Sequence, residues 1–175
     1  MITYLLSILF FLANPTADTS TLEAGPIQWM TWDEAVEDNK KSPKKILVDV
    51  YTDWCGYCKK MDKGTFTDVE LAAYINENFY AVKLDAEQKE DIIWNDVTFK
   101  FIPQGRKGAH ELAISLLNGK MGYPLFVYLD ETFSRIMISP GYKTAPMMQN
   151  ELVYAVEEYY KSKTWADYKA ELKGE

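Results

Sequence analysis

The chain has 175 residues, of which 47% are hydrophobic, and this size and composition predict one domain with a sizeable core. Its 26 acidic residues outnumber its 19 basic residues, and the net charge of −7 argues against nucleic acid or an anionic membrane surface as a partner. Two cysteines and one histidine are too few for a structural zinc site built from four such ligands.

The N-terminal segment predicts a leader. The first seventeen residues carry no charge, and residues 2–13 form an apolar run broken only by a threonine and a serine. This run is shorter than the roughly 20 residues that a bilayer-spanning helix needs and is typical of a secretory signal. No basic residue precedes it and Pro15 lies near the candidate cleavage site, so an uncleaved anchor or a misassigned start is the alternative. We predict a leader over residues 1–17, export, and no stable membrane insertion after processing.

The first predicted helix begins at a capping box. Thr31 precedes Glu34 by three residues, the spacing at which each side chain bonds the other's backbone N–H. The helix is expected to run to about Lys41, where Ser42-Pro43 ends it. The apolar run 46–51 follows and predicts a buried central strand.

The next segments alternate between helical and extended patterns. Asp68 can cap a helix over residues 69–76, whose apolar residues recur at helical spacing. Residues 79–85 then alternate as a strand. This order is typical of parallel strands joined by helices.

Residues 86–108 separate that strand from the next predicted helix. Within them, residues 97–102 alternate and predict a strand or short hairpin, and residues 103–108 predict a turn-rich basic loop. A helix is expected from about Ala109 to Leu117, ended by Asn118-Gly119.

The C-terminal third predicts a hairpin and helices. Residues 125–130 and 133–139, linked by Glu131-Thr132, form the expected antiparallel hairpin. Residues 146–160 predict an amphipathic helix and residues 165–173 an additional one. Several aromatic residues of this region are expected to pack against one another and not to bind a ligand: Tyr154, Tyr159, Tyr160 and Trp165.

The two cysteines, Cys55 and Cys58, directly follow the predicted central strand. If a helix begins near Cys55, this thiol lies where free backbone N–H groups and the helix dipole favour an anion. Because the thiolate is the form that attacks a disulfide, Cys55 is the predicted nucleophile. Cys58 lies one helical turn further on and deeper, and it is the predicted resolving thiol that opens the mixed disulfide.

The sequence gives less support to other uses of the cysteines. A metal centre would need carboxylates or a second subunit besides the two cysteines and His110. A purely structural disulfide across so short a loop would gain little loop-closure entropy. A cysteine protease needs a histidine base, and His110 is expected at the surface or at a helix start. Thiol–disulfide chemistry is therefore the favoured interpretation.

Residues 48–61 resemble the strand, Trp-Cys-x-x-Cys motif and helix of the thioredoxin superfamily, and the resemblance extends over roughly residues 27–160. It implies an α/β thioredoxin-like fold over residues 27–175, with a central mixed sheet flanked by helices, an insertion before the third helix and a C-terminal helical extension. The layout is similar to thioredoxin-like proteins that bacteria export, including C-terminal domains of transmembrane thiol reductases. This similarity implies a periplasmic or otherwise exported protein.

The resemblance also implies a catalytic carboxylate. Asp49 stands six positions before Cys55, where thioredoxins keep a buried carboxylate that relays a proton for the resolving thiol. Burial among apolar strand residues predicts a raised pKa for Asp49. The alternative is an aspartate at a strand edge that faces water.

A further part of the implied site precedes the strand at residue 125. Proteins of the superfamily carry a cis-proline there, and the resemblance places it at Pro124. The backbone of Tyr123 would then pair with an incoming extended peptide, whereas an ordinary trans proline at a strand start is the alternative. The resemblance completes the substrate-binding residues with three neighbours of the cysteines: Trp54, Gly56 and Tyr57.

The residues between the cysteines bear on the direction of electron flow. Gly56-Tyr57 replaces the Gly-Pro of reducing thioredoxins and matches periplasmic disulfide isomerases at these positions, which puts a purely reducing role in doubt. We expect a protein disulfide reductase or isomerase with no metal and no cofactor beyond the Cys55–Cys58 disulfide. Its expected partners are proteins with disulfides and an unidentified thiol electron donor.

Two other functions stay open at this point. The dithiol could bind a soft metal such as Cu(I), for which thiolates are apt ligands, or the fold could serve as a redox-silent interaction domain. The insertion at residues 86–108 is expected either to help choose partners or to be a structural embellishment.

Overall fold

The computed structural model describes residues 25–105 and 107–174, so the leader predicted over residues 1–17 lies outside the described residues. A five-stranded mixed sheet forms the centre, in the order β1-β3-β2-β8-β9. Its strands are β1 (Trp29–Met30), β2 (Lys45–Tyr51), β3 (Phe79–Asp85), β8 (Leu125–Leu129) and β9 (Arg135–Pro140). Strand β2 pairs parallel with β3 and antiparallel with β8, so it is the middle strand, and the cysteines follow its C-terminal end.

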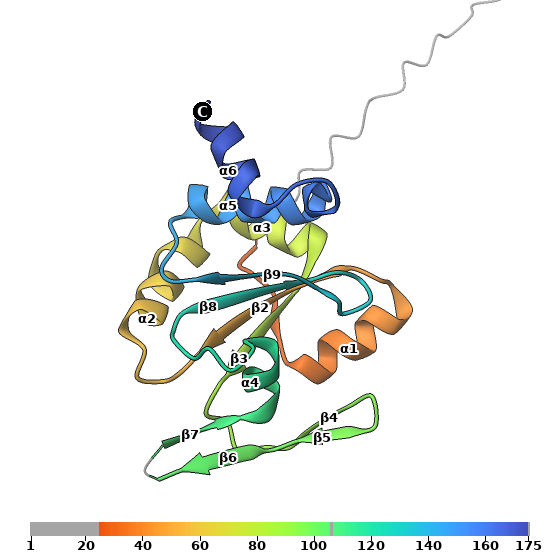
Figure 1. Cartoon of the computed structure of the whole chain (residues 1–175), viewed down its shortest axis with the longest axis vertical. Coiled ribbons are helices and arrows are strands. Elements are labelled where there is room, and N and C mark those ends of the chain that lie inside the picture. The colour runs from red at the N-terminus through yellow and green to blue at the C-terminus, as the bar shows by residue number, and fades with distance from the viewer. Residues whose placement is uncertain (1–24, 106, 175) are drawn as a thin grey trace, which may run out of the picture.

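Helices cover both faces of the sheet (Figure 1). One face packs against α1 (Trp32–Lys41) and α4 (Glu111–Leu116), and the other against α2 (Gly56–Lys63), α3 (Val69–Asn78) and α5 (Ala145–Val156). Alternate residues of β2 divide between the two cores, because successive side chains of a strand point to opposite faces. Ile46, Val48 and Val50 belong to the first core and Leu47 to the second. The α/β thioredoxin-like fold is therefore confirmed, but the insertion at residues 86–108 precedes α4, the fourth helix in chain order, and not the third.

Local capping explains where the predicted helices begin. The Thr31 hydroxyl and the Glu34 carboxylate form both bonds of the capping box at the start of α1. The Asp68 carboxylate accepts the Leu71 N–H at 2.9 Å at the start of α3. Each cap satisfies backbone donors that the first helical turn leaves free. None of the helices over residues 25–105 and 107–174 has the length and apolar character needed to cross a membrane.

The insertion differs from its prediction, because it forms two hairpins. Strands β4 (Ile92–Trp94) and β5 (Val97–Phe99) pair with each other, as do β6 (Phe101–Gln104) and β7 (Lys107–His110). The predicted basic loop over residues 103–108 is thus mostly strand. Ala109 and His110 pair with Ile102 and Phe101 in the second hairpin, so α4 begins at Glu111 and not at Ala109.

His110 is at a helix start, as expected, but it is not at the surface. It is fully buried as the N-cap of α4, and its Nδ1 accepts the Leu112 N–H at 3.3 Å. Its Nε2 lies 3.1 Å from the Glu90 carbonyl oxygen, and its backbone N–H donates to the Ala86 carbonyl oxygen at 2.7 Å. His110 therefore ties the insertion to the end of β3.

Gly108 is required by the close approach of Phe101 across the second hairpin. A Cβ built on Gly108 would lie 2.2 Å from Phe101 Cζ and 2.5 Å from the Ile102 carbonyl oxygen. We expect Gly108→Ala to lower the free energy of unfolding by roughly 1–3 kcal/mol, the usual cost of overpacking. Urea unfolding measures this loss. Gly122→Ala is the matched control, since its Cβ meets no atom within 4 Å, and equal stability of the two variants would contradict this account.

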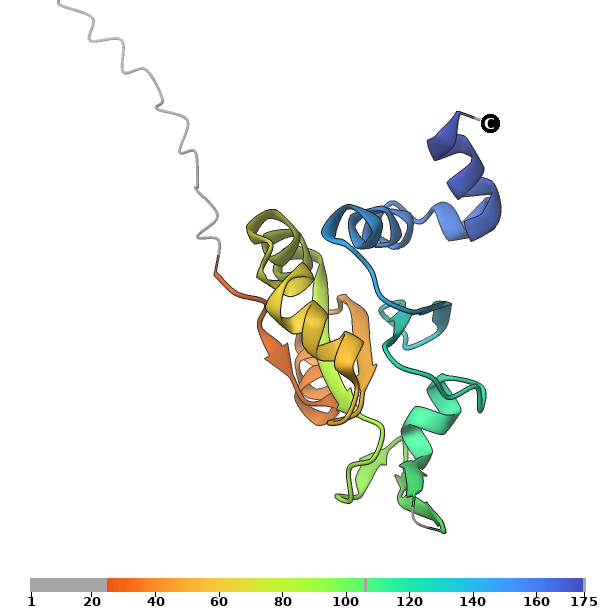
Figure 2. The same cartoon turned by 90° about the vertical axis from the view of Figure 1, so that its left-hand side faces the viewer.

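The C-terminal helices end differently from the prediction but pack as expected. Helix α5 stops at Val156 instead of continuing to Tyr160, and a 3₁₀ turn (Tyr159–Lys161) leads to α6 (Trp165–Lys173), which lies beyond α5 in Figure 2. The Tyr154 ring contacts the Trp165 and Tyr168 rings at centroid distances of 5.2 and 5.3 Å. The aromatic residues of this region are thus packing residues, and α6 is the predicted extension.

Three further features of the fold are an edge strand, a hairpin and a short turn. The short strand β1 at the sheet edge has no counterpart among the predicted elements, since it contains only two residues. The hairpin of β8 and β9 is confirmed, but its loop covers residues 130–134 and not only Glu131-Thr132. In this loop the Asp130 carboxylate accepts the N–H groups of Thr132 and Ser134, each at 2.9 Å. A 3₁₀ turn (Thr65–Thr67) joins α2 to α3.

Candidate active site

Cys55 and Cys58 are joined as a disulfide at the start of α2, with their Cα atoms 5.3 Å apart. Cys55 is the N-cap residue, and its Sγ accepts the Cys58 backbone N–H at 3.1 Å. A free N–H aimed at this sulfur stabilises negative charge on it, which is what the predicted nucleophile needs. Cys55 is 4% exposed and Cys58 2%, so the expected difference in depth is small in the disulfide state.

Two large side chains flank the disulfide and face solvent. Trp54 is 62% exposed and Tyr57 63% exposed. The Trp54 indole N–H donates to the Glu87 carboxylate at 3.1 Å, and its ring meets the Tyr123 ring edge-on at 5.7 Å. The structure therefore brings Trp54 and Tyr123, far apart in sequence, to one side of the cysteines.

The Tyr123–Pro124 peptide bond is cis, as the resemblance implied. Tyr123 is half-buried, and burial together with the carboxylates of Glu87 and Asp85 raises the pKa of its phenol to about 12. The phenol is therefore neutral at physiological pH and available as a hydrogen-bond donor.

The insertion borders the surroundings of the cysteines. A groove of about 570 Å³ is lined by Trp54 and Tyr123 on one side and by β7 residues Lys107 and Gly108 on the other. Lys107 Nζ lies 6.0 Å from the centre of the Trp54 ring. The second hairpin thus forms one wall of a groove next to the cysteine motif, a position from which it can contact a partner.

Asp49 is buried, as predicted, and is not an edge residue facing water. It is 1% exposed in the central strand β2. Burial disfavours the carboxylate and raises the pKa of Asp49 to about 6, although the ammonium group of Lys83 partly offsets this effect. Its Oδ1 receives no hydrogen bond from any described residue. Such a group can accept and release a proton near neutral pH.

Lys83 is a site residue that the sequence interpretation missed. It pairs with Asp49 across β2 and β3, and its Nζ lies 2.7 Å from Asp49 Oδ2 and also pairs with Asp62 on α2. Burial opposes its charge, but the two carboxylates outweigh burial and raise the pKa of Lys83. The available signal was a lysine in the otherwise apolar run 79–84, but its register opposite Asp49 follows only from the fold.

Removal of Lys83 tests its effect on the carboxylate. We expect Lys83→Met to raise the pKa of Asp49 above its value of about 6, because the cation that favours the charged form is gone. Carbon-13 NMR titration of the aspartate carboxyl groups measures this shift. Lys100→Met is the control, since Lys100 pairs with Asp91 on the insertion, and an unchanged Asp49 titration in Lys83→Met would contradict the assignment.

Asp49 lies on the side of the sheet that carries the cysteine helix. It shares a face of β2 with Leu47, whose core includes Met61 of α2, and Lys83 connects it to Asp62 of the same helix. Among the described residues, no group of three or more His, Cys, Asp or Glu side chains is arranged to hold a metal ion. The site thus consists of a disulfide, a buried carboxylate and an exposed aromatic rim.

Similarities to known proteins agree with this arrangement. The chain is 34% identical over 68 residues to spermatogenesis-associated protein 20 of Rattus norvegicus, a match covering 38% of this chain and 9% of that protein. It is 31% identical over 72 residues to disulfide bond reductase DsbH of Chlamydia pneumoniae, covering 41% of this chain and 43% of the relative. Each match therefore spans less than half of the relative's own length.

Similarity to a solved structure supports the fold. A thioredoxin-fold protein from Helicobacter pylori superposes with a TM-score of 0.58 and 18% identity, covering 89% of this chain and 91% of that one. Residues 19–172 match the family Thioredox_DsbH, described as a protein of unknown function, DUF255. Because this match covers most of the sequence, and because the fold and the Cys-x-x-Cys pair agree with it, the chain belongs to the Thioredox_DsbH family of the thioredoxin superfamily.

Proposed function

We propose that this protein is a thiol–disulfide oxidoreductase that reduces or isomerises disulfides of other proteins. The observation that carries the proposal is the Cys55 sulfur at the N-terminus of α2, where it accepts the Cys58 N–H. This position stabilises a thiolate at Cys55 over one at Cys58. The related protein of Chlamydia pneumoniae is named a disulfide bond reductase, which supports the same chemistry.

The reaction exchanges one disulfide for another. In the reduced protein, the Cys55 thiolate attacks one sulfur of the partner's disulfide, an S–S bond forms between them, and the partner's other sulfur leaves as a thiolate that takes up a proton. The Cys58 thiol then loses its proton and attacks the Cys55 sulfur, which releases the partner's second thiol. The partner gains two electrons and two protons, and the protein ends with the Cys55–Cys58 disulfide.

Asp49 is proposed as the group that takes the proton from Cys58. It faces the side of the sheet covered by α2, and its pKa of about 6 lets it be ionised at neutral pH yet readily protonated. A base whose pKa lies near the working pH is most effective in such a transfer. Lys83 is a positioning residue that holds the Asp49 carboxylate by an ion pair at 2.7 Å.

The aromatic rim is the proposed contact surface for the partner. Trp54 and Tyr57 are exposed, one before and one after Cys55 in the sequence. The Trp54 ring contacts the Tyr123 ring, and Tyr123 and Pro124 directly precede β8. Exposed aromatic side chains supply large contact area at low entropic cost, which suits a surface that must accept varied extended segments. Gly56 has no side chain, and the space beside its Cα is open, so a partner segment can approach there.

Export is part of the proposal. It is supported by the apolar run at residues 2–13 and by the use of the only two cysteines as one reactive pair, without further structural disulfides in the sequence. The electron donor is proposed to be a thiol protein that exchanges with the oxidised Cys55–Cys58 pair.

Insulin reduction tests the activity. The wild-type protein is expected to accelerate the reduction of insulin disulfides by dithiothreitol, followed as the precipitation of the free B chain. A rate equal to that with dithiothreitol alone would overturn the proposal and favour a redox-silent interaction domain.

The equilibrium potential of the cysteine pair, measured against glutathione, decides the direction of electron flow between this protein and its partners. A value near −270 mV, like that of thioredoxin, indicates a reductant, whereas a value of about −120 to −180 mV indicates an oxidant or isomerase. Mass spectrometry of the protein after thiol alkylation at each glutathione ratio gives the oxidised fraction.

A further inference from the structure

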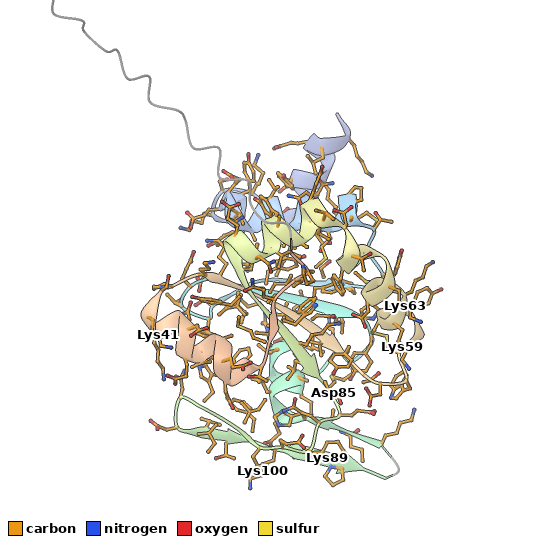
Figure 3. All side chains as sticks on the ribbon, turned by 180° about the vertical axis from the view of Figure 1, so that it is seen from behind. Lys41, Lys59, Lys63, Asp85, Lys89 and Lys100 are labelled. Atoms are coloured by element: carbon orange, nitrogen blue, oxygen red, sulfur yellow. A yellow bond between two sulfur atoms is a disulfide. The ribbon has the colours of Figure 1, made fainter. Side chains whose placement is uncertain are left out.

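A basic hollow lies beside the cysteine motif and shares no lining residue with the groove at Trp54. It has a volume of about 500 Å³ and is lined by Gly56, Gly64, Tyr142 and three lysines of α2: Lys59, Lys60 and Lys63. Figure 3 shows Lys59 and Lys63 close together on α2, on the opposite side of the molecule from Lys41 on α1. Gly56 lies between the two cysteines in the sequence, so one end of the hollow borders the Cys-x-x-Cys motif.

The lysines of this hollow carry charge without a partner in the described structure. None of the three makes an ion pair or a side-chain hydrogen bond with residues 25–105 or 107–174. The Lys60 ammonium group lies over the Tyr142 ring, 4.8 Å from its centre. Asp62, the acidic residue of the same helix, is directed to Lys83 and not to the hollow. Three uncompensated positive charges therefore share one small surface.

This patch is opposite in sign to the protein as a whole. The net charge is −7, and the lysines of α1 lie beside acidic residues: Lys40 pairs with Glu37 and Lys41 with Asp38. Lysines at the end of a helix do offset its dipole, which accounts for Lys60 and Lys63 within α2. The dipole does not explain why Lys60 and Lys63, together with Lys59, line one hollow that borders the cysteine motif.

We infer that this hollow, Lys59, Lys60 and Lys63 with Gly56 and Tyr142, receives an acidic segment that flanks the disulfide of a protein partner. The inference rests on the proposed disulfide exchange and names the class of partner. Positive charge beside the Cys-x-x-Cys motif raises the rate of encounter with a negatively charged segment and disfavours a positively charged one. The exposed Tyr57 ring, 6.1 Å from the Tyr142 ring, supplies apolar contact at the edge of the same surface.

The test uses the full-length protein reduced in advance, so that no electron donor is needed. Three short peptides are compared, each closed by one intramolecular disulfide and flanked by aspartates, by serines or by lysines. Rapid mixing with iodoacetamide quenching and mass spectrometry gives the second-order rate of peptide reduction in a single turnover. At low ionic strength we expect the aspartate peptide to react about tenfold faster than the lysine peptide, and we expect this ratio to fall toward one as salt screens the charges.

Matched variants test whether the lysines of the hollow cause the preference for the aspartate peptide. The double variant Lys59→Gln/Lys63→Gln is expected to lose most of the ratio between the aspartate and lysine peptides. The control Lys40→Gln/Lys41→Gln removes the same number of charges from α1 and is expected to keep the ratio. Thermal unfolding of both variants confirms that they are folded.

The outcomes separate this inference from the proposed function. Equal rates for the three peptides with the wild-type protein would overturn the inference and leave the disulfide chemistry standing. A preference that survives in Lys59→Gln/Lys63→Gln but disappears in the α1 control would also overturn it. A wild-type protein that reduces none of the peptides would overturn the proposed function, and the inference with it.

Discussion

Replacing Cys55 with serine will reduce the rate of insulin reduction to that of dithiothreitol alone. The serine hydroxyl is not ionised at neutral pH, so the backbone N–H that favours a thiolate at this position has no anion to stabilise. Without a sulfur at position 55, no mixed disulfide forms and no step of the exchange takes place. The insulin assay with equal amounts of folded wild type and variant measures the effect, which is the complete loss of the catalysed rate.

Cys58→Ser is the matched variant, with the same atom replaced one helical turn later. It keeps the nucleophile but lacks the thiol that resolves the mixed disulfide, so it is expected to accumulate covalent adducts with client proteins. Non-reducing electrophoresis and mass spectrometry after incubation with oxidised insulin will show them. Equal insulin reduction by wild type and Cys55→Ser, or adducts on Cys55→Ser in place of Cys58→Ser, would contradict the assigned roles.

Asp49→Asn will slow the resolution of the mixed disulfide by about 100-fold, the lower end of what a positioned base contributes. Asparagine fills the same space in β2 but cannot take the Cys58 proton. In the wild type the resolution rate is expected to rise with pH through about 6, where the Asp49 carboxyl ionises. In the variant this rise is absent, and the rate increases only where the Cys58 thiol itself ionises.

Asp62→Asn is the control for this prediction. Asp62 contacts the same Lys83 ammonium group but lies on the exposed surface of α2. Its removal is expected to slow resolution far less than the removal of Asp49. The rate is followed in a single turnover with a peptide mixed disulfide formed on reduced protein. Equal slowing by the two variants would mean that the charge near Lys83, and not the buried carboxyl of Asp49, carries the effect.

Asp49→Asn is also expected to stabilise the fold at neutral pH. The pKa of Asp49 is about 6 in the folded protein against an ordinary value of 3.8, so between these pH values the folded state binds more protons than the unfolded chain. The free energy of unfolding of the wild type therefore falls as pH rises through this window, by roughly 3 kcal/mol. The asparagine of the variant does not titrate. Urea unfolding should therefore show that the free energy of unfolding of the variant, relative to that of the wild type, increases between about pH 4 and pH 7. Parallel pH profiles would contradict the raised pKa.

The features of the fold and of the site that could be predicted are those that depend on local sequence. The capping box at Thr31 and the cap at Asp68 depend on neighbouring residues alone, and both are confirmed. The helix start at Cys55 followed from the resemblance, and it is confirmed as well. The burial of Asp49 followed from its place in an apolar strand. The position of Pro124 followed from resemblance, since its neighbours say nothing of the cysteines far before it in the chain.

The features that could not be predicted depend on strand register and on chain geometry. Lys83 lies opposite Asp49 only because β3 pairs in parallel with β2 at that register. The second hairpin has Gly105 at its tip and brings Lys107 near Trp54. The turn-forming residues of this segment are equally consistent with a loop, so the sequence alone does not predict the hairpin. The basic hollow includes Tyr142, which lies far from α2 in sequence and reaches it only in the folded chain.

The most direct test of the account is the ionisation of the two thiols in the reduced protein. The rate of alkylation by iodoacetamide is measured against pH, with the modified residue identified by mass spectrometry. We predict that Cys55 ionises with a pKa between roughly 3.5 and 7.5 and reacts much faster than Cys58 at neutral pH. If both thiols ionise near the ordinary value of about 8.5 and react at equal rates, the position of Cys55 at the start of α2 confers no reactivity and the account is wrong.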